Sequence, residues 1–414
     1  MIIKTLILRN AAFAPVIIAS ICLIIRASFP ITAAFFLSKQ DYVTAVIIVQ
    51  FLSIGGLLAG LEFHSVIIRD LSKNINSSHA IQLAVFKNLA TALPRTLVGY
   101  LIIFIFIFFA VETAVTFLFY FPILFIIVYL DLLLSEAARI KNTCGKFVKG
   151  SLLVNFKNVS WLFILPIMLF LNLGIIESII LAYLISFIII KLLFCDDFKL
   201  SYLIVFPKKL FVNLIRFRSM LRPSLLLMCV GWLALINPIL ERYVLVLIGN
   251  YAFAASFFFV GSLVAIAHVF TTNVALIPYH SVFISPNKII DIKRIWIRLI
   301  TTSILMVIAL GIVYQLVPDK YFPEGIEKEW YIFGPMLISS QIIVAGSFFS
   351  IRLYAAKADL ILFLISTLEI ILRVTMIFCL SIVERFDLIP MAMMLLIFLM
   401  YLVRHYFYRK ANID

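Results

Sequence analysis

The chain has 414 residues, of which 64% are hydrophobic and only 13% are charged, so its polar side chains cannot coat a soluble globule. The apolar runs are continuous rather than alternating, which favours membrane-spanning helices over a β-barrel. The net charge of +14 lies mostly between these runs, where Lys and Arg mark cytoplasmic loops, and it does not indicate a nucleic-acid partner. The composition therefore predicts an all-α integral membrane protein.

The first six predicted helices form an N-terminal lobe over residues 1–195. Residues 1–37 are interpreted as an uncleaved first helix, because the apolar run exceeds that of a signal peptide and contains Arg26. The other helices are predicted at 42–61, 96–112, 115–135, 151–172 and 175–194. The basic segment that ends at Arg95 is expected in the cytoplasm. In the second helix, Gly55, Gly56 and Gly60 predict close approach by neighbouring helices.

A basic cytoplasmic connection at 196–222 is expected to lead into a C-terminal lobe at 223–414. Its six helices are predicted at 223–248, 252–272, 299–317, 331–351, 359–382 and 388–403. Arg404 is expected just after the last helix, on the inner side. With twelve helices every Lys/Arg-rich loop falls on one side, which predicts a multi-pass protein with both termini in the cytoplasm.

Two adjacent charges, Glu241 and Arg242, interrupt the apolar run of the seventh helix. A charge near the bilayer centre costs at least about 2.5 kcal/mol, so such residues by default face a protein interior or a wet cavity and serve a function. The alternative is structural, with Arg242 extending to the outer interface and Glu241 capping a neighbouring group. The sequence alone leaves both interpretations open.

Two segments carry a resemblance to a known family. They are FLSKQDYVTAVIIVQFLSIGGLLAGLEFHSVIIRDLSKN, with an acidic-Tyr turn before a helix, and LERYVLVLIGNYAFAASFFFVGSL, where the family commonly has Asp-Arg-Tyr in place of Glu241-Arg242-Tyr243. Two segments that overlap these, PITAAFFLSKQDYVTAVIIVQF and PILERYVLVLIGNYAFAASFFF, each have a helix with a proline, a very short outer turn and a second apolar helix, which predicts two repeated halves. The chain resembles the O-antigen repeat-unit flippases and polysaccharide-biosynthesis export proteins of the oligosaccharide-lipid and multidrug exporter superfamily. It departs from their pattern at Asn250 and Val43.

The resemblance implies a MATE-like fold and a role in lipopolysaccharide biosynthesis at the bacterial inner membrane. Such a flippase moves an undecaprenyl-pyrophosphate-linked oligosaccharide from the cytoplasmic to the periplasmic leaflet. Its implied partners are the lipid-linked oligosaccharide, membrane lipid, a polysaccharide polymerase and chain-length proteins. The route for the pyrophosphate would have to be polar and cationic, a task that suits arginine.

Four cations inside predicted spans are candidates for this route: Arg26, Lys157, Arg242 and Arg373. Arg26 and Arg242 are expected on opposite walls of a central cavity. Lys157 has an alternative interpretation, in which its side chain extends to the inner interface. Arg373 follows Glu369 by four residues, so the two also fit a simple ion pair that lets the helix insert.

Three carboxylates are candidates for coupling transport to an ion gradient: Asp131, Glu241 and Glu369. The sequence contains no nucleotide-binding loop, so any driving force would have to come from ion or potential gradients. Three other residues, Gln50, Asn237 and Gln341, could bind sugar hydroxyls or join helices to one another.

The alternatives are a multidrug exporter of the same fold and a membrane polysaccharide polymerase. The exporter would be expected to present carboxylates to cationic drugs, and the polymerase a large periplasmic loop. The longest predicted outer loop, 318–329, is too short to build such a site. The sequence shows no nucleophile with a base, and its five cysteines lack ligand spacing, so no enzyme activity, cofactor or metal is predicted.

Overall fold

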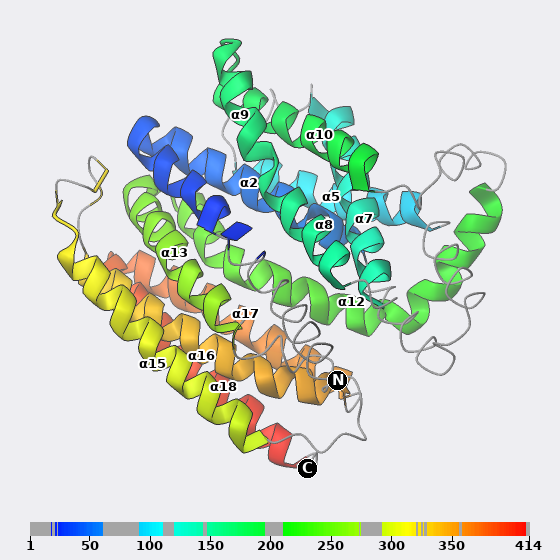
Figure 1. Cartoon of the computed structure of the whole chain (residues 1–414). Coiled ribbons are helices and arrows are strands. Elements are labelled where there is room, and N and C mark those ends of the chain that lie inside the picture. The colour runs from blue at the N-terminus through cyan, green and yellow to red at the C-terminus, as the bar shows by residue number, and fades with distance from the viewer. Residues whose placement is uncertain are drawn as a thin grey trace, which may run out of the picture. The chain divides into compact units, whose positions relative to one another are not determined.

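A computed structural model describes residues 18, 21–22, 24–60, 91–110, 120–143, 147–194, 210–272, 274, 292–319, 322–323, 326, 329–355 and 358–410. Within these ranges every regular element is a helix, and nine helices are long and apolar enough to cross a membrane (Figure 1). The predicted all-α membrane fold is confirmed at this level.

The helices, in chain order, have the following bounds. They are α2 (Lys39–Ala59), α5 (Ala92–Ala110), α7 (Phe121–Thr143), α8 (Phe147–Val159), α9 (Trp161–Phe170), α10 (Ile175–Phe194), α12 (Leu210–Leu247), α13 (Tyr251–Thr271), α15 (Ile292–Leu316), α16 (Trp330–Ala355), α17 (Asp359–Ile382), the short 3-10 helix η5 (Phe386–Leu388) and α18 (Ile389–Lys410).

The nine long apolar helices each overlap a predicted span. Three shorter apolar stretches of the described residues, Ile24–Phe36, Ala92–Ile102 and Ser224–Leu233, overlap the other three predicted spans, and the last two are parts of α5 and α12. Stretches of this length do not by themselves establish spans, because about 20 apolar residues are needed to cross a bilayer. The number of twelve spans and their orientation therefore stay predictions.

Two predicted boundaries are wrong. The third helix was predicted to begin at residue 96, after the basic segment that ends at Arg95, but α5 begins at Ala92 and Arg95 lies within it, fully buried. The connection at 196–222 was expected to precede the seventh helix, yet α12 already begins at Leu210 and continues for 38 residues. In both places basic residues favour a loop by composition, but here they lie within a helix.

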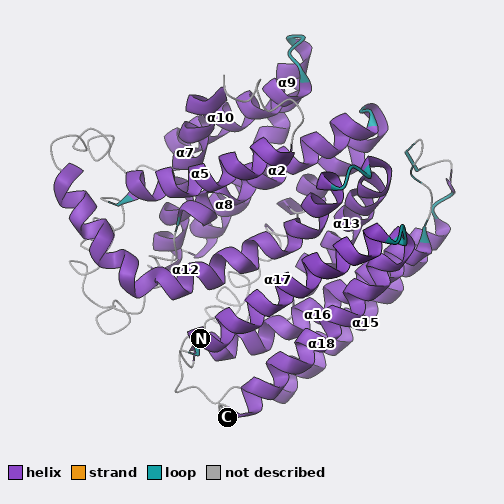
Figure 2. Cartoon of the chain, turned by 180° about the vertical axis from the view of Figure 1, so that it is seen from behind, coloured by secondary structure: helices purple, strands orange, loops and turns teal. Residues whose placement is uncertain are grey.

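The chain forms two compact units, one from Met1–Val43 with Ile236–Asp414 and one from Thr44–Leu235. We call them the C-terminal unit and the central unit. In the C-terminal unit α16 packs against α13, α15, α17 and α18, and in the central unit α7 packs against α5, α8 and α10 (Figures 1 and 2). The grouping places residues 1–43 with the C-terminal helices, and the predicted lobes at 1–195 and 223–414 stay a prediction.

Glycines let the helices of the central unit approach closely. A Cβ atom on Gly56 would lie 2.6 Å from the backbone nitrogen of Leu132 on α7, and a Cβ on Gly99 would lie 2.6 Å from Cα of Ala59 on α2. These separations are shorter than a van der Waals contact, so each position excludes any side chain. The predicted role of Gly56 in helix packing is confirmed.

The turn between α12 and α13 follows from its sequence. Gly249 has a φ of 82°, a conformation that glycine adopts at little cost. The side chain of Asn250 then accepts a hydrogen bond of 3.0 Å from the backbone N–H of Phe253, which caps the first turn of α13. The short turn predicted after the seventh helix is present at this place, and its position on the outer side stays a prediction.

Candidate functional site

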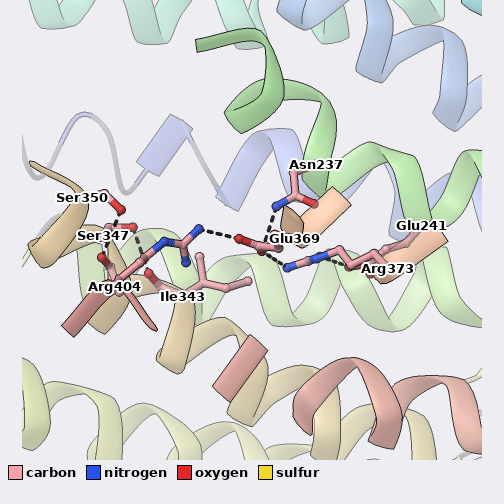
Figure 3. Close-up of polar contacts among 9 residues, drawn as sticks. Asn237, Glu241, Ile343, Ser347, Ser350, Glu369, Arg373 and Arg404 are labelled. Carbon is pink, nitrogen blue, oxygen red and sulfur yellow. Dashed lines mark hydrogen bonds and ion pairs between the residues drawn. The ribbon is translucent and has the colours of Figure 1, made fainter. Parts of the chain in front are cut away.

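Glu369 is the centre of a polar cluster inside the C-terminal unit. Its side chain, which is 3% exposed, accepts hydrogen bonds from Arg373 at 2.6 Å and Asn237 at 2.9 Å, and it pairs with Arg404 (Figure 3). These partners come from three helices, α12, α17 and α18. The predicted ion pair between Glu369 and Arg373 is confirmed, but it belongs to a larger arrangement.

Arg373 extends the cluster to a second carboxylate. Its Nη1 pairs with Glu241 on α12 while its Nη2 binds Glu369. The charges thus alternate in the order Glu241, Arg373, Glu369 and Arg404, an arrangement that we call the ionic ladder. Removing one partner of a buried ion pair costs more than the pair contributes, because the other charge is left without compensation.

Helical periodicity places these side chains. Glu369 and Arg373 follow the buried residues Leu362 and Ile365 on one face of α17. Arg404 follows Met393, Ile397 and Met400 at helical spacing on α18, although it was expected in an inner loop. This spacing is a signal by which sequence reasoning could have found Arg404, had the last helix been extended.

Arg242 lies beside the ladder but is not a member of it. Its Cζ is 5.5 Å from the ring centroid of Phe258 on α13, and a Cβ on Gly261 would lie 2.5 Å from its Nη2. Among the described residues no hydrogen bond or ion pair joins Arg242 to another side chain, although the charge of the neighbouring Glu241 attracts it. With Arg242 added to the two arginines and two carboxylates of the ladder, these five described residues carry one positive charge in excess.

A second buried cluster lies in the central unit and contains Asp131 on α7 and Lys157 on α8. Their side chains are 1% and 4% exposed, and they form an ion pair. Lys157 also donates to the Ser135 hydroxyl at 2.6 Å, and Asp131 accepts from the backbone N–H of Gly56. A side chain so fully enclosed does not extend to the bilayer interface, which corrects the alternative interpretation of Lys157.

Next to this pair, Glu136 binds two arginines that the sequence did not indicate as site residues. Arg95 lies 3.6 Å and Arg139 3.0 Å from the Glu136 carboxylate, and Arg95 donates to the Gly60 carbonyl at 3.1 Å. These contacts join α2, α5 and α7. The available signal was the carboxylate of Glu136 itself, which lies near the end of the mainly apolar helix α7.

The structure thus distributes the predicted site residues over two places. Glu241, Glu369 and Arg373 come together in the ladder, with Arg242 beside it, and Asp131 and Lys157 pair in the central unit. Arg26 is half-buried in the helical segment 24–36 and belongs to the same unit as Arg242, so opposite walls of a cavity stay a prediction.

Two of the three polar residues that were candidates for sugar binding or for joining helices do join helices. Asn237 binds Glu369, and Gln341 on α16 accepts a hydrogen bond of 2.9 Å from Thr271 on α13. Within the described ranges no group of three or more His, Cys, Asp or Glu side chains is placed to hold a metal ion. The chemical feature of the C-terminal unit is the partly buried guanidinium of Arg242, whose N–H donors bind no acceptor among the described residues.

Comparison with known proteins does not assign the chain to a group: no protein-family model, no curated protein and no solved structure matches it.

Proposed function

We propose that the chain is a flippase that moves an undecaprenyl-pyrophosphate-linked oligosaccharide, such as an O-antigen repeat unit, from the cytoplasmic to the periplasmic leaflet. The observation that carries the proposal is the guanidinium of Arg242 inside an apolar helix, where no acceptor of the described residues binds it. A cation in such a place is expensive and by default serves a substrate or ion path. The five N–H donors of a guanidinium match phosphate oxygens in a bidentate fork.

Charge balance favours this substrate over a cationic drug. Both carboxylates of the ladder are engaged by arginine, and the region keeps one positive charge in excess. A cationic drug would be repelled there, whereas a pyrophosphate would replace part of its lost hydration with charge-assisted hydrogen bonds. A multidrug exporter of the same fold is therefore the weaker candidate.

The proposal includes the setting that the sequence resemblance implies. The chain would lie in the bacterial inner membrane with twelve spans in two MATE-like lobes and both termini in the cytoplasm. Its partners would be the lipid-linked oligosaccharide, membrane lipid and the polymerase and chain-length proteins of polysaccharide assembly. The chain would transport its substrate and would not act as an enzyme.

Ion coupling is the less direct part of the proposal. Moving one charge inward across the potential yields about 2.3 kcal/mol per 100 mV, and a carboxylate that binds the ion could use it. Glu241 is the better candidate than Glu369, because its side chain is 13% exposed and has one arginine partner where Glu369 has two. Transport that persists unchanged after both proton and sodium gradients are collapsed would contradict coupling.

The experiment that tests the function is a leaflet assay with the purified full chain in liposomes. Lipid-linked oligosaccharide carrying a fluorophore on its sugar is added, and a membrane-impermeant quencher reports the outer-leaflet fraction. We expect transfer well above that of protein-free liposomes, and no acceleration for a fluorescent phospholipid. Equal acceleration of both lipids indicates nonspecific scrambling, and no acceleration of either one contradicts the proposal.

A further inference from the structure

The guanidinium of Arg242 is held in place by its neighbours, but its hydrogen-bond donors have no acceptor among the described residues. The ring of Phe258 lies below it at 5.5 Å, and the missing side chain of Gly261 makes the space that Nη2 occupies. A cation–π contact consumes none of the five N–H donors of an arginine. Within the described part of the chain no acceptor binds these donors, so they remain available to a ligand.

A second unsatisfied group lies near it. Tyr42, in the first turn of α2, is 1% exposed, and its hydroxyl is without a hydrogen-bond partner among the described residues. Tyr42 and Arg242 interact electrostatically and belong to the same compact unit. A buried tyrosine hydroxyl usually finds a partner, and one that lacks it requires an explanation.

The two groups share a chemical demand. A guanidinium only donates hydrogen bonds, and a tyrosine hydroxyl can donate one, so both are satisfied by a ligand with several acceptor oxygens. The adjacent carboxylate, Glu241, is paired through its Oε1 with Arg373, and no hydrogen bond joins it to Arg242 among the described residues. The charge in excess at Arg242 also selects a negative ligand.

We propose that Arg242 and Tyr42 form a subsite for a phosphate group. The ring of Phe258 supports the guanidinium of Arg242 from one side, and the absence of a side chain at Gly261 leaves room for its Nη2. The assignment of that phosphate to the pyrophosphate of the lipid-linked oligosaccharide rests on the proposed function. The headgroup of an anionic phospholipid offers the same oxygens and is the other source of this chemistry.

The test measures binding of inorganic pyrophosphate to the purified full chain by titration calorimetry. We expect saturable binding, weakened about 100-fold by Arg242→Gln and about tenfold by Tyr42→Phe, as loss of charge-assisted hydrogen bonds requires. Gly261→Ala keeps every charge but displaces Nη2, so it should also weaken binding. The matched controls, Arg385→Gln and Tyr406→Phe, alter exposed residues and should bind as the wild type does.

Several results would overturn the subsite. One is the absence of saturable pyrophosphate binding by the wild type. Another is wild-type affinity in both Tyr42→Phe and Gly261→Ala. These two changes are small, so they test the subsite even if Arg242→Gln does not fold. Displacement of pyrophosphate by lipid-linked oligosaccharide and not by phosphatidylglycerol supports the substrate assignment, and the reverse overturns it. Flipping without pyrophosphate binding removes the subsite alone, whereas binding without flipping supports the subsite and contradicts the flippase.

Discussion

The buried carboxylates in the described part of the chain are held by cations. Asp131 pairs with Lys157, Glu136 with Arg95 and Arg139, and the ladder satisfies Glu241 and Glu369. An ion pair in a low-dielectric interior does little for net stability, but its disruption is costly. These residues are therefore expected to govern folding as well as transport, and variants at them need a stability measurement beside any activity measurement.

The Asp131–Lys157 pair gives the clearest prediction at this scale. Asp131→Ala should lower the free energy of unfolding by about 3–5 kcal/mol, because Lys157 is left buried without a counter-charge. Adding Lys157→Met should restore most of that loss. The measurement is unfolding of the purified protein in mixed micelles.

Arg385→Gln serves as the control for that series, because its pair with Asp387 is exposed and should contribute nothing measurable. A double variant no more stable than Asp131→Ala alone would mean that the buried charge is not the cause.

Sequence reasoning found charges in helices but not their partners. The spacing of Glu369 and Arg373 sufficed to predict one ion pair, since both lie on the same helix. Glu241 and Arg404 belong to the same ladder but lie on two other helices, and no pattern within one helix predicts contacts with another helix. Arg95 was missed because a basic residue at a helix start was interpreted as a loop residue.

At the scale of elements, small residues set the distances between helices. The backbones of α2, α5 and α7 approach at Gly56 and Gly99, where no Cβ atom fits. Glycine in membrane helices commonly permits such contacts, and the polar groups of neighbouring helices then come within hydrogen-bond distance. The contact of the Gly56 N–H with Asp131 is an example.

Alanine substitutions should separate contact glycines from free ones. Gly56→Ala and Gly99→Ala force an extra methyl group against backbone and should each destabilise the protein by about 1–3 kcal/mol. Gly311→Ala, on α15, meets nothing within 4 Å and should be neutral or slightly stabilising. Thermal unfolding of the three variants is the measurement. A loss for Gly311→Ala equal to the others would indicate a general intolerance of glycine replacement.

Helix positions were predictable because an apolar run of about 20 residues has few alternatives in a membrane protein. Errors arose at ends such as Leu210 of α12, where a helix continues into polar sequence. Hydropathy predicts the apolar segment of a helix that crosses the lipid. It does not predict how far the helix continues into polar sequence, where contacts with protein stabilise it.

At the scale of the molecule, orientation is the main untested expectation. Single cysteines labelled in intact cells should be protected from impermeant reagents on the cytoplasmic side and reactive on the other. The expected cytoplasmic positions are Lys73, Lys146, Arg218 and Lys293, and the expected periplasmic ones are Lys39, Glu177 and Glu324. The basic loops account for this arrangement, because Lys and Arg stay on the cytoplasmic side. One reversed position would exclude the twelve-span topology.

The most direct test of the account concerns its cationic route. We expect Arg26→Ala combined with Arg242→Ala to reduce the rate of lipid-linked oligosaccharide transfer in liposomes at least about tenfold, with the protein still folded, since two charge-assisted contacts to pyrophosphate are lost. Lys at both positions should restore part of the rate, because it keeps the charge but not the fork. A double alanine variant that transfers the lipid at the wild-type rate would contradict the cationic route.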